Sequence, residues 1–198
     1  MNSNGIDDFL LTLNLKYTYF KEIQVSDYSQ IISWINDSTF NKFLYQGLTH
    51  VTNESFSKQV NDEKFLENAK IFSQFNKLTN KLVGWCGLYF PASKIYESVK
   101  KAEIRSFVGT EFWGKGYGTE QYITLVTMGF EFFKLNKVFF GTHQDNIGTQ
   151  KIYQKLNFFQ EGVSRQDYFR TSFADIYRYS ILQNEYNENI KKIFQSYL

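Results

Sequence analysis

The sequence predicts an α+β fold built on one mixed β-sheet in a single domain. The chain has 198 residues, which is the size of one globular domain. Hydrophobic residues make up 42% of it and aromatic residues 19%, so there is ample material for a core. The hydrophobic period changes repeatedly along the chain. Its order is strand, two helices, three or four strands, then helix, strand, helix and a strand pair.

The first half begins with a polar leader and then alternates between aromatic and polar residues, which is typical of a strand. Ser26 can cap the helix that follows, in which Tyr28, Ile31 and Ile35 recur at helical spacing. A Leu-Thr-Asn turn joins two later strand-like runs as a hairpin. We therefore expect strands at 15–23, 69–77, 81–90 and 101–109, a helix after Ser26 and a weaker helix within 53–67.

The second half begins with a glycine-rich stretch that leads into a strongly amphipathic segment. Tyr122, Val126 and Phe130 keep one face of this segment apolar. After it we expect a short buried strand, a helix, two paired strands and a polar helical tail. The predicted bounds are 118–134 for the first helix, 137–143 for the strand, 146–157 for the second helix, 158–182 for the strand pair and 184–198 for the tail.

Composition and charge exclude several classes of function. The net charge of +2 comes from 22 basic and 20 acidic residues, which is too balanced for a nucleic-acid or anionic membrane surface. One cysteine, Cys86, and two histidines argue against an internal disulfide and against a metal site. The N-terminus lacks a signal-peptide pattern, and no apolar run reaches 18 residues. We therefore expect a cytoplasmic protein without nucleic-acid or membrane partners.

The stretch VGTEFWGKGYGTEQ at 108–121 places glycines at three alternating positions, Gly114, Gly116 and Gly118. Its first part, GTEFWGKG, nearly fits the nucleoside triphosphate loop but has glycine where a hydroxyl residue must hold magnesium. A dinucleotide fingerprint also fails, because Thr119 and Gln121 occupy its last glycine position in either register. A plain glycine-rich turn remains open. The other interpretation is a pyrophosphate cradle, in which main-chain N–H groups at a helix N-terminus bind the phosphates.

The residues EFWGKGYGTEQ resemble motif A of the GNAT N-acetyltransferases, whose pattern is [QR]-x-x-G-x-[GA]. Gly116 and Gly118 match the two small residues of that pattern. Trp113 stands where glutamine or arginine is usual, as in the branch resembling ribosomal-protein N-terminal acetyltransferases. The resemblance continues in NKVFFGTHQDNIGTQKIYQKLNFFQEG and, upstream, in IISWINDSTFNKFL, although Asn157 replaces a usual glycine.

The resemblance spans about residues 15–182 and implies one acyl-CoA N-acyltransferase domain over 1–198, with 184–198 as a tail. It implies a mostly antiparallel mixed sheet with helices on both faces. Acetyl-CoA would lie in the splay between two parallel strands, 102–109 and 137–143. A bulge at the end of the first strand would free main-chain N–H groups for the pantetheine arm and the thioester carbonyl. The cofactor-binding residues that the resemblance implies are Phe107, Val108, Gly109, Trp113, Gly114, Lys115, Gly116, Tyr117, Gly118, Thr119, Asn146 and Tyr153.

Two residues are candidates for the chemistry. The resemblance implies that Tyr153 donates a proton to the coenzyme sulfur, and the alternative is a packing aromatic. Glu103 lies in the strand that would line the cleft, where it can take the amine's proton or orient the acceptor. Its alternative is a surface carboxylate paired with Arg105 or Lys101. For Asn146, a simple helix N-cap is the alternative to a pantetheine contact.

The acceptor is less well defined by the sequence than the donor. Trp34, Tyr45 and Trp85 are candidate pocket aromatics, and Asp175 either reads the acceptor or pins a loop. Cys86 and His143 are interpreted as structural. The expected acceptor is a small amine such as an amino sugar, then a protein N-terminus, then an antibiotic. A non-catalytic acyl-CoA-binding module is the rival class, and the tail can serve a homodimer.

Overall fold

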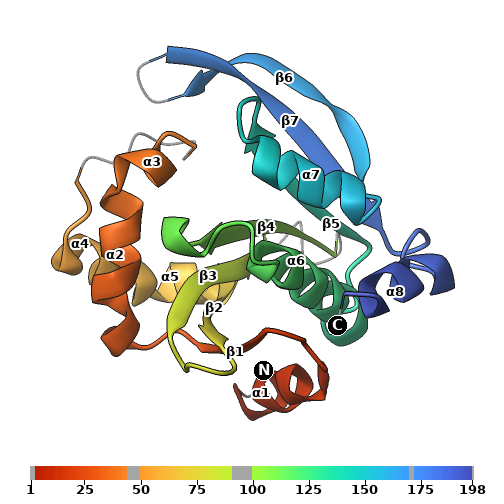
Figure 1. The fold of residues 1–198 in the computed structure, drawn as a ribbon, viewed down its shortest axis with the longest axis horizontal. Helices are drawn as coiled ribbons and strands as arrows, with labels where there is room; N and C mark the ends of the chain where they lie inside the picture. Colours follow the sequence, from red (N-terminus) through yellow and green to blue (C-terminus); the bar gives the residue numbers. More distant parts are fainter. Residues whose placement is uncertain (1–2, 44–49, 91–99, 170–171, 198) are drawn as a thin grey trace.

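The computed structural model describes residues 3–43, 50–90, 100–169 and 172–197. In these segments seven strands form one mixed sheet in the order β1-β2-β3-β4-β5-β7-β6 (Figure 1). Only β4 and β5 pair in parallel among them, so the predicted α+β class with a mixed, mostly antiparallel sheet is confirmed. The strands are β1 (Thr18–Glu22), β2 (Ala69–Asn76), β3 (Leu82–Tyr89), β4 (Lys101–Val108), β5 (Lys137–His143), β6 (Phe159–Phe169) and β7 (Ser172–Leu182).

Helices cover both faces of the sheet. Ala102 and Ile104 of β4 belong to the larger apolar core, which also contains residues of the first helix and of the last three. Phe107, on the other face of β4, packs with the helices that follow β1. The helices are α1 (Ser3–Thr12), α2 (Tyr28–Asn36), α3 (Ser38–Asn41), α4 (Asn53–Val60), α5 (Glu63–Asn68), α6 (Tyr117–Thr127), α7 (Ile147–Lys155) and α8 (Glu188–Gln195).

The parallel strands β4 and β5 part soon after they meet. Their ladder contains three pairs, of which Glu103 and Phe139 form the last. Beyond that point β4 continues alongside β3 to Val108, and β5 continues alongside β7 to His143. The expected splay therefore opens toward the carboxyl ends of both strands, where β4 leads into α6.

The predicted bulge at the end of β4 is wrong. The register of β4 against β3 is unbroken from Glu103–Tyr89 to Val108–Gly84. A register shift does occur between β2 and β3, at Gln74 and Phe75 of β2. Divergence of β5 is what leaves the edge of β4 unpaired, so no extra residue is needed to free its N–H groups.

The two ends of the chain differ from expectation. The polar leader contains α1, whose Ile6 and Leu10 are buried in the larger core. The tail is helical as predicted, but α8 buries Ile190 and Phe194 in the same core, so it is not a purely polar appendage. In the segments described, no helix is long and apolar enough to cross a membrane.

Candidate active site

The glycine loop between β4 and α6 exposes its main chain. Gly116 has a φ of +87° and caps α6 in the left-handed region, which favours glycine. Gly114 has a φ of +75°, and a β-carbon built on it would contact nothing within 4 Å. The first intrahelical bond runs from Glu120 N–H to Gly116 C=O, so the N–H groups of the preceding turn are free of helical partners. This geometry fits a pyrophosphate.

The larger side chains of the loop support its shape. The indole N–H of Trp113 donates to the Val108 carbonyl over 2.8 Å, and Lys115 donates to the Glu111 carbonyl over 3.1 Å. The Tyr117 hydroxyl turns beneath the loop and accepts from the Asn76 amide at 2.7 Å. Trp113 thus fastens the loop to the end of β4, and the main chain is left for a ligand.

A buried polar network lies under the first turn of α6. Glu120 is 1% exposed, and its carboxylate accepts from Tyr17 N–H (2.8 Å) and from the Thr18 hydroxyl (2.5 Å). The Gln74 amide donates to Thr18 and to the Tyr117 carbonyl, both at 3.0 Å. The network therefore ties the cradle to β1 and β2.

Gln121 extends this network to β4. Its amide donates to the Gln74 side chain (2.8 Å) and to the Phe107 carbonyl (2.7 Å). Glu120 and Gln121 were missed as site residues, because we assigned the helix only by its apolar stripe. The available signal was a pair of long polar side chains in the first turn of a helix otherwise rich in apolar residues.

The last residues of β4 present one free edge to the splay. Gly109 N–H donates to the Val83 carbonyl over 2.9 Å, on the side of β3. Successive N–H groups of a strand point to opposite edges, so the Val108 N–H faces the splay. Of the three predicted main-chain residues, Val108 is the one whose N–H is directed there.

Two tyrosine hydroxyls meet at the base of the splay. Tyr153 of α7 is fully buried, and its hydroxyl lies 2.8 Å from that of Tyr122 of α6. The Tyr153 ring packs on Phe140, which follows the last β5 residue paired with β4. Burial raises the pKa of Tyr153 well above its usual value and that of Tyr122 to about 12.

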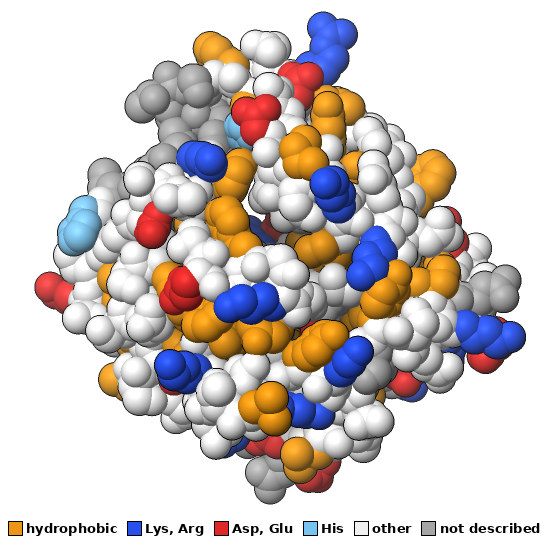
Figure 2. Space-filling view, viewed as in Figure 1, with side chains coloured by type: hydrophobic (Ala, Val, Ile, Leu, Met, Phe, Trp, Pro, Cys, Tyr) orange, Lys and Arg blue, Asp and Glu red, His pale blue; other side chains and the backbone are white. Residues whose placement is uncertain are grey.

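A space-filling view shows a hollow on this side of the molecule. It opens at the centre of the face, between α7 and the segment that leads from β4 into α6 (Figures 1 and 2). The hollow therefore lies beside the segment that carries the glycine cradle.

Comparison with known proteins identifies the family to which this arrangement belongs. The family model described as an acetyltransferase (GNAT) domain matches residues 18–158. The chain belongs to the GNAT acetyltransferase family. It is 27% identical over 181 residues to the uncharacterized N-acetyltransferase p20 of Bacillus licheniformis, with 88% of this chain and 98% of p20 covered. The protein is thus an acetyl-CoA-dependent N-acetyltransferase.

Solved GNAT structures share the fold. A spermidine N-acetyltransferase from Vibrio cholerae, in complex with CoA and spermine, superposes with a TM-score of 0.74 at 17% identity, covering 85% of this chain and 97% of that one. The ribosomal-protein-S5-alanine acetyltransferase from Vibrio fischeri gives the same TM-score at 16% identity, with 88% and 98% covered. At these identities the likeness concerns the fold.

In this GNAT enzyme Glu103 lies on the face of the sheet opposite α6. Both Nε and Nη2 of Arg105 donate to one carboxylate oxygen of Glu103, at 3.1 and 2.9 Å. The Arg105 guanidinium also stacks on Tyr89, 4.4 Å from its ring centroid. The Glu103 side chain is 30% exposed, so the carboxylate is paired and remains accessible from solvent.

The predicted acceptor aromatics differ in their surroundings. Trp34 is 4% exposed, donates its indole N–H to Glu111 and packs so closely on Gly109 that a built β-carbon would lie 2.5 Å from its ring. Trp85 is partly exposed, and its buried indole N–H has no hydrogen-bond partner among the described residues. Tyr45 lies outside the described residues. Of the two that the structure describes, Trp85 is the one with an unpaired indole N–H.

The remaining predicted residues have local structural contacts. The Asn146 side chain caps α7 by accepting from Thr149 N–H at 3.2 Å. The Asp175 carboxylate accepts from Gln166 N–H at 2.9 Å and so holds a β6 residue whose φ is +50°. His143 Nδ1 accepts from Asp145 N–H at 3.1 Å. Asn146 and Asp175 each keep a further polar atom, the amide nitrogen and the second carboxylate oxygen, that has no hydrogen-bond partner among the described residues and is available to a ligand.

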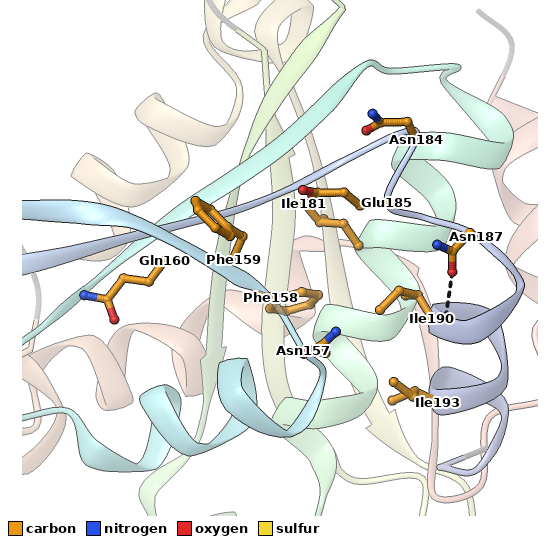
Figure 3. Close-up of a pocket in the computed structure, with 10 residues that line it drawn as sticks. All are labelled: Asn157, Phe158, Phe159, Gln160, Ile181, Asn184, Glu185, Asn187, Ile190 and Ile193. Atoms are coloured by element: carbon orange, nitrogen blue, oxygen red, sulfur yellow. Dashed lines mark hydrogen bonds between the residues drawn. The ribbon is translucent and has the colours of Figure 1, made fainter.

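A separate pocket of about 520 Å³ lies between the start of β6, the end of β7 and α8 (Figure 3). Asn157, Phe159, Ile181 and Ile190 are among its lining residues, and Asn187 caps the start of α8 beside it. None of the predicted site residues lines this pocket. It is therefore distinct from the splay.

Proposed function

We propose that this GNAT enzyme transfers the acetyl group of acetyl-CoA to the primary amine of a small molecule, such as an amino sugar, by direct attack. The observation that carries the proposal is the coincidence of the β4–β5 splay, the glycine cradle at its mouth and the tyrosine hydroxyls at its base. The cradle supplies main-chain donors for the pyrophosphate. The splay then directs the acyl end toward Tyr153.

Main-chain and side-chain groups divide the binding of the donor. The Val108 N–H is directed into the splay, where it can bond the thioester carbonyl and stabilise the negative charge that develops on it. The amides from Gly114 to Thr119 hold the phosphates. Asn146 contributes its free amide nitrogen to the pantetheine arm while its oxygen caps α7.

The reaction moves one proton away from nitrogen and one onto sulfur. Glu103, directly or through water, takes the proton of the attacking amine as the new C–N bond forms. The C–S bond breaks, and the departing thiolate takes a proton from the Tyr153 hydroxyl. The amine proton on Glu103 passes to solvent, and the phenolate recovers one from solvent, so the sum is amine and thioester to amide and thiol.

The charges on the acceptor face favour a monoamine over a polyamine. Glu103 is paired with Arg105, and Asp167 with Arg178 at 3.3 Å. Each of these carboxylates is thus neutralised by a neighbouring guanidinium, which weakens the attraction for a multiply charged cation. The similarity to the spermidine N-acetyltransferase therefore supports the fold and the acetyl donor that we propose, but gives little support for a polyamine as the acceptor of this enzyme.

An acceptor screen that follows thiol release from acetyl-CoA tests the proposal. The panel should contain amino sugars, polyamines, aminoglycosides and peptides with free N-termini. We expect turnover with a small monoamine. Turnover with peptides alone would show that the acceptor is a protein N-terminus and not a small amine. If no compound of the panel causes thiol release although calorimetry shows that acetyl-CoA binds, the result would support a non-catalytic binding module instead.

A further inference from the structure

Tyr122 stands out among the buried groups because its polar atom meets the atom proposed to protonate sulfur. The two rings are perpendicular, with centroids 5.0 Å apart and an interplanar angle of 85°. Tyr122 is 4% exposed and Tyr153 is fully buried, so water does not compete for their hydrogen bond. The pairing of these two hydroxyls is therefore a fixed feature of the core.

The contact lies at the point where the strands part. Tyr122 comes from α6, and the side chain of Ser106 on β4 is among the groups that lower its pKa. Ser106 lies three residues beyond Glu103, the last β4 residue paired with β5, and is partly exposed. The hydrogen-bonded pair of Tyr122 and Tyr153 thus joins α6 to α7, and Ser106 of β4 acts on the pKa of Tyr122.

We propose that Tyr122 is a positioning residue, whose hydroxyl orients the Tyr153 hydroxyl so that the proton of Tyr153 points toward the departing sulfur. Two hydroxyls 2.8 Å apart share one proton between them, and either can be the donor. When Tyr122 donates, the Tyr153 proton is left free for the splay. The same hydrogen bond stabilises the Tyr153 phenolate that forms as the proton leaves.

The surroundings of Tyr153 affect how readily its hydroxyl gives up a proton. Burial among aromatic rings raises its pKa, which keeps the hydroxyl protonated and also makes it a reluctant donor. The hydrogen bond with Tyr122 raises this pKa further when Tyr153 is the donor, so the stabilisation of the phenolate comes from the reversed bond, in which Tyr122 donates to the Tyr153 oxygen. Glu103 also raises the pKa values of both tyrosines, and no cation is among the groups that act on Tyr153 in this way.

A double-mutant cycle tests the proposal, which rests on the proposed acetyl transfer. Tyr122→Phe keeps the ring and removes the hydroxyl. We expect kcat to fall about tenfold with the KM for acetyl-CoA unchanged, and about 100-fold for Tyr153→Phe. The double variant should match Tyr153→Phe, because Tyr122 acts through that hydroxyl. A purely structural role of Tyr122 would make the two effects multiply.

Tyr186→Phe is the matched control, since its hydroxyl bonds Thr127 and Glu131 away from the splay. It should leave kcat unchanged. Unaltered kcat in Tyr122→Phe, or multiplicative losses, would overturn the proposal. If Tyr122→Phe does not fold, Ser106→Ala takes its place. A loss of kcat that disappears in the Tyr153→Phe background would support the proposal. An unchanged kcat in Ser106→Ala would overturn it. A wild-type enzyme without turnover would overturn the proposed function as well.

Discussion

The carboxylate of Glu120 accepts a 2.5 Å hydrogen bond from the hydroxyl of Thr18, which lies 102 residues earlier in the chain. Both side chains are buried, and among the described residues no cation forms a hydrogen bond or ion pair with Glu120. A buried carboxylate is costly unless donors satisfy it. Here the donors are Tyr17, just before β1, and Thr18, at its start, so the same bonds that satisfy the carboxylate also fix the start of α6 against the sheet.

Replacing Glu120 should therefore affect both stability and donor binding. In Glu120→Ala the Tyr17 N–H and the Thr18 hydroxyl lose their acceptor, and we expect the free energy of unfolding to fall by about 3 kcal/mol. Glu120→Gln keeps one acceptor and should cost about 1 kcal/mol. Urea unfolding and acetyl-CoA calorimetry measure the two effects, with the exposed Glu54→Gln as control. Unchanged acetyl-CoA affinity in a destabilised Glu120→Ala protein would contradict the link to the cradle.

Gly116 gives a prediction about the cradle itself. Its φ of +87° is unfavourable for residues with a β-carbon, although that carbon would meet only the Tyr17 ring at 3.3 Å. We expect Gly116→Ala to cost about 1 kcal/mol in stability and to weaken acetyl-CoA binding about tenfold. Gly116→Asn should recover part of the stability, because asparagine tolerates this conformation better. Calorimetry that finds both variants binding like the wild type would exclude the loop as the phosphate site.

Much of the fold could be predicted from hydrophobic period. The strand at 137–143 was placed to the residue, since its alternation leaves Val138, Phe140 and Thr142 buried. By contrast, α1 was missed because the leader is polar overall, and only Ile6 and Leu10 reveal its buried face. The bulge on β4 could not be judged from one strand's sequence, because it depends on register with β3.

The candidate site was predictable where main chain is the functional group. The glycines at 114, 116 and 118 indicate a main-chain binding site, because without side chains they leave their N–H groups open to a ligand. Tyr122 was counted only as an apolar stripe residue, since sequence cannot show that its hydroxyl meets that of Tyr153 across two helices. The network of Glu120 depends likewise on β1, which is distant in sequence.

Variants of Glu103 and Arg105 distinguish two roles of Glu103, that of the base that accepts the amine proton and that of a carboxylate that only pairs with Arg105. Glu103→Gln keeps the shape and one acceptor, and we expect kcat to fall by about 10² with little change in acetyl-CoA affinity. Arg105→Gln removes the partner but leaves the carboxylate, so kcat should fall by less than tenfold. Steady-state kinetics on the acceptor found by the screen supplies both values. Equal losses in the two variants would show that the ion pair, rather than proton removal, is what the reaction needs.

The buried tyrosines predict how stability depends on pH. In the unfolded chain Tyr122 ionises near its ordinary pKa of about 10, whereas burial raises the folded value to about 12. Its contribution to stability is therefore complete below pH 10 and is lost as pH rises toward 12, by up to about 1.4 kcal/mol per pH unit. Urea unfolding at pH 8 to 11 should show a shallower decline for Tyr122→Phe than for the wild type. Parallel declines would mean that Tyr122 does not hold its proton more tightly in the folded protein.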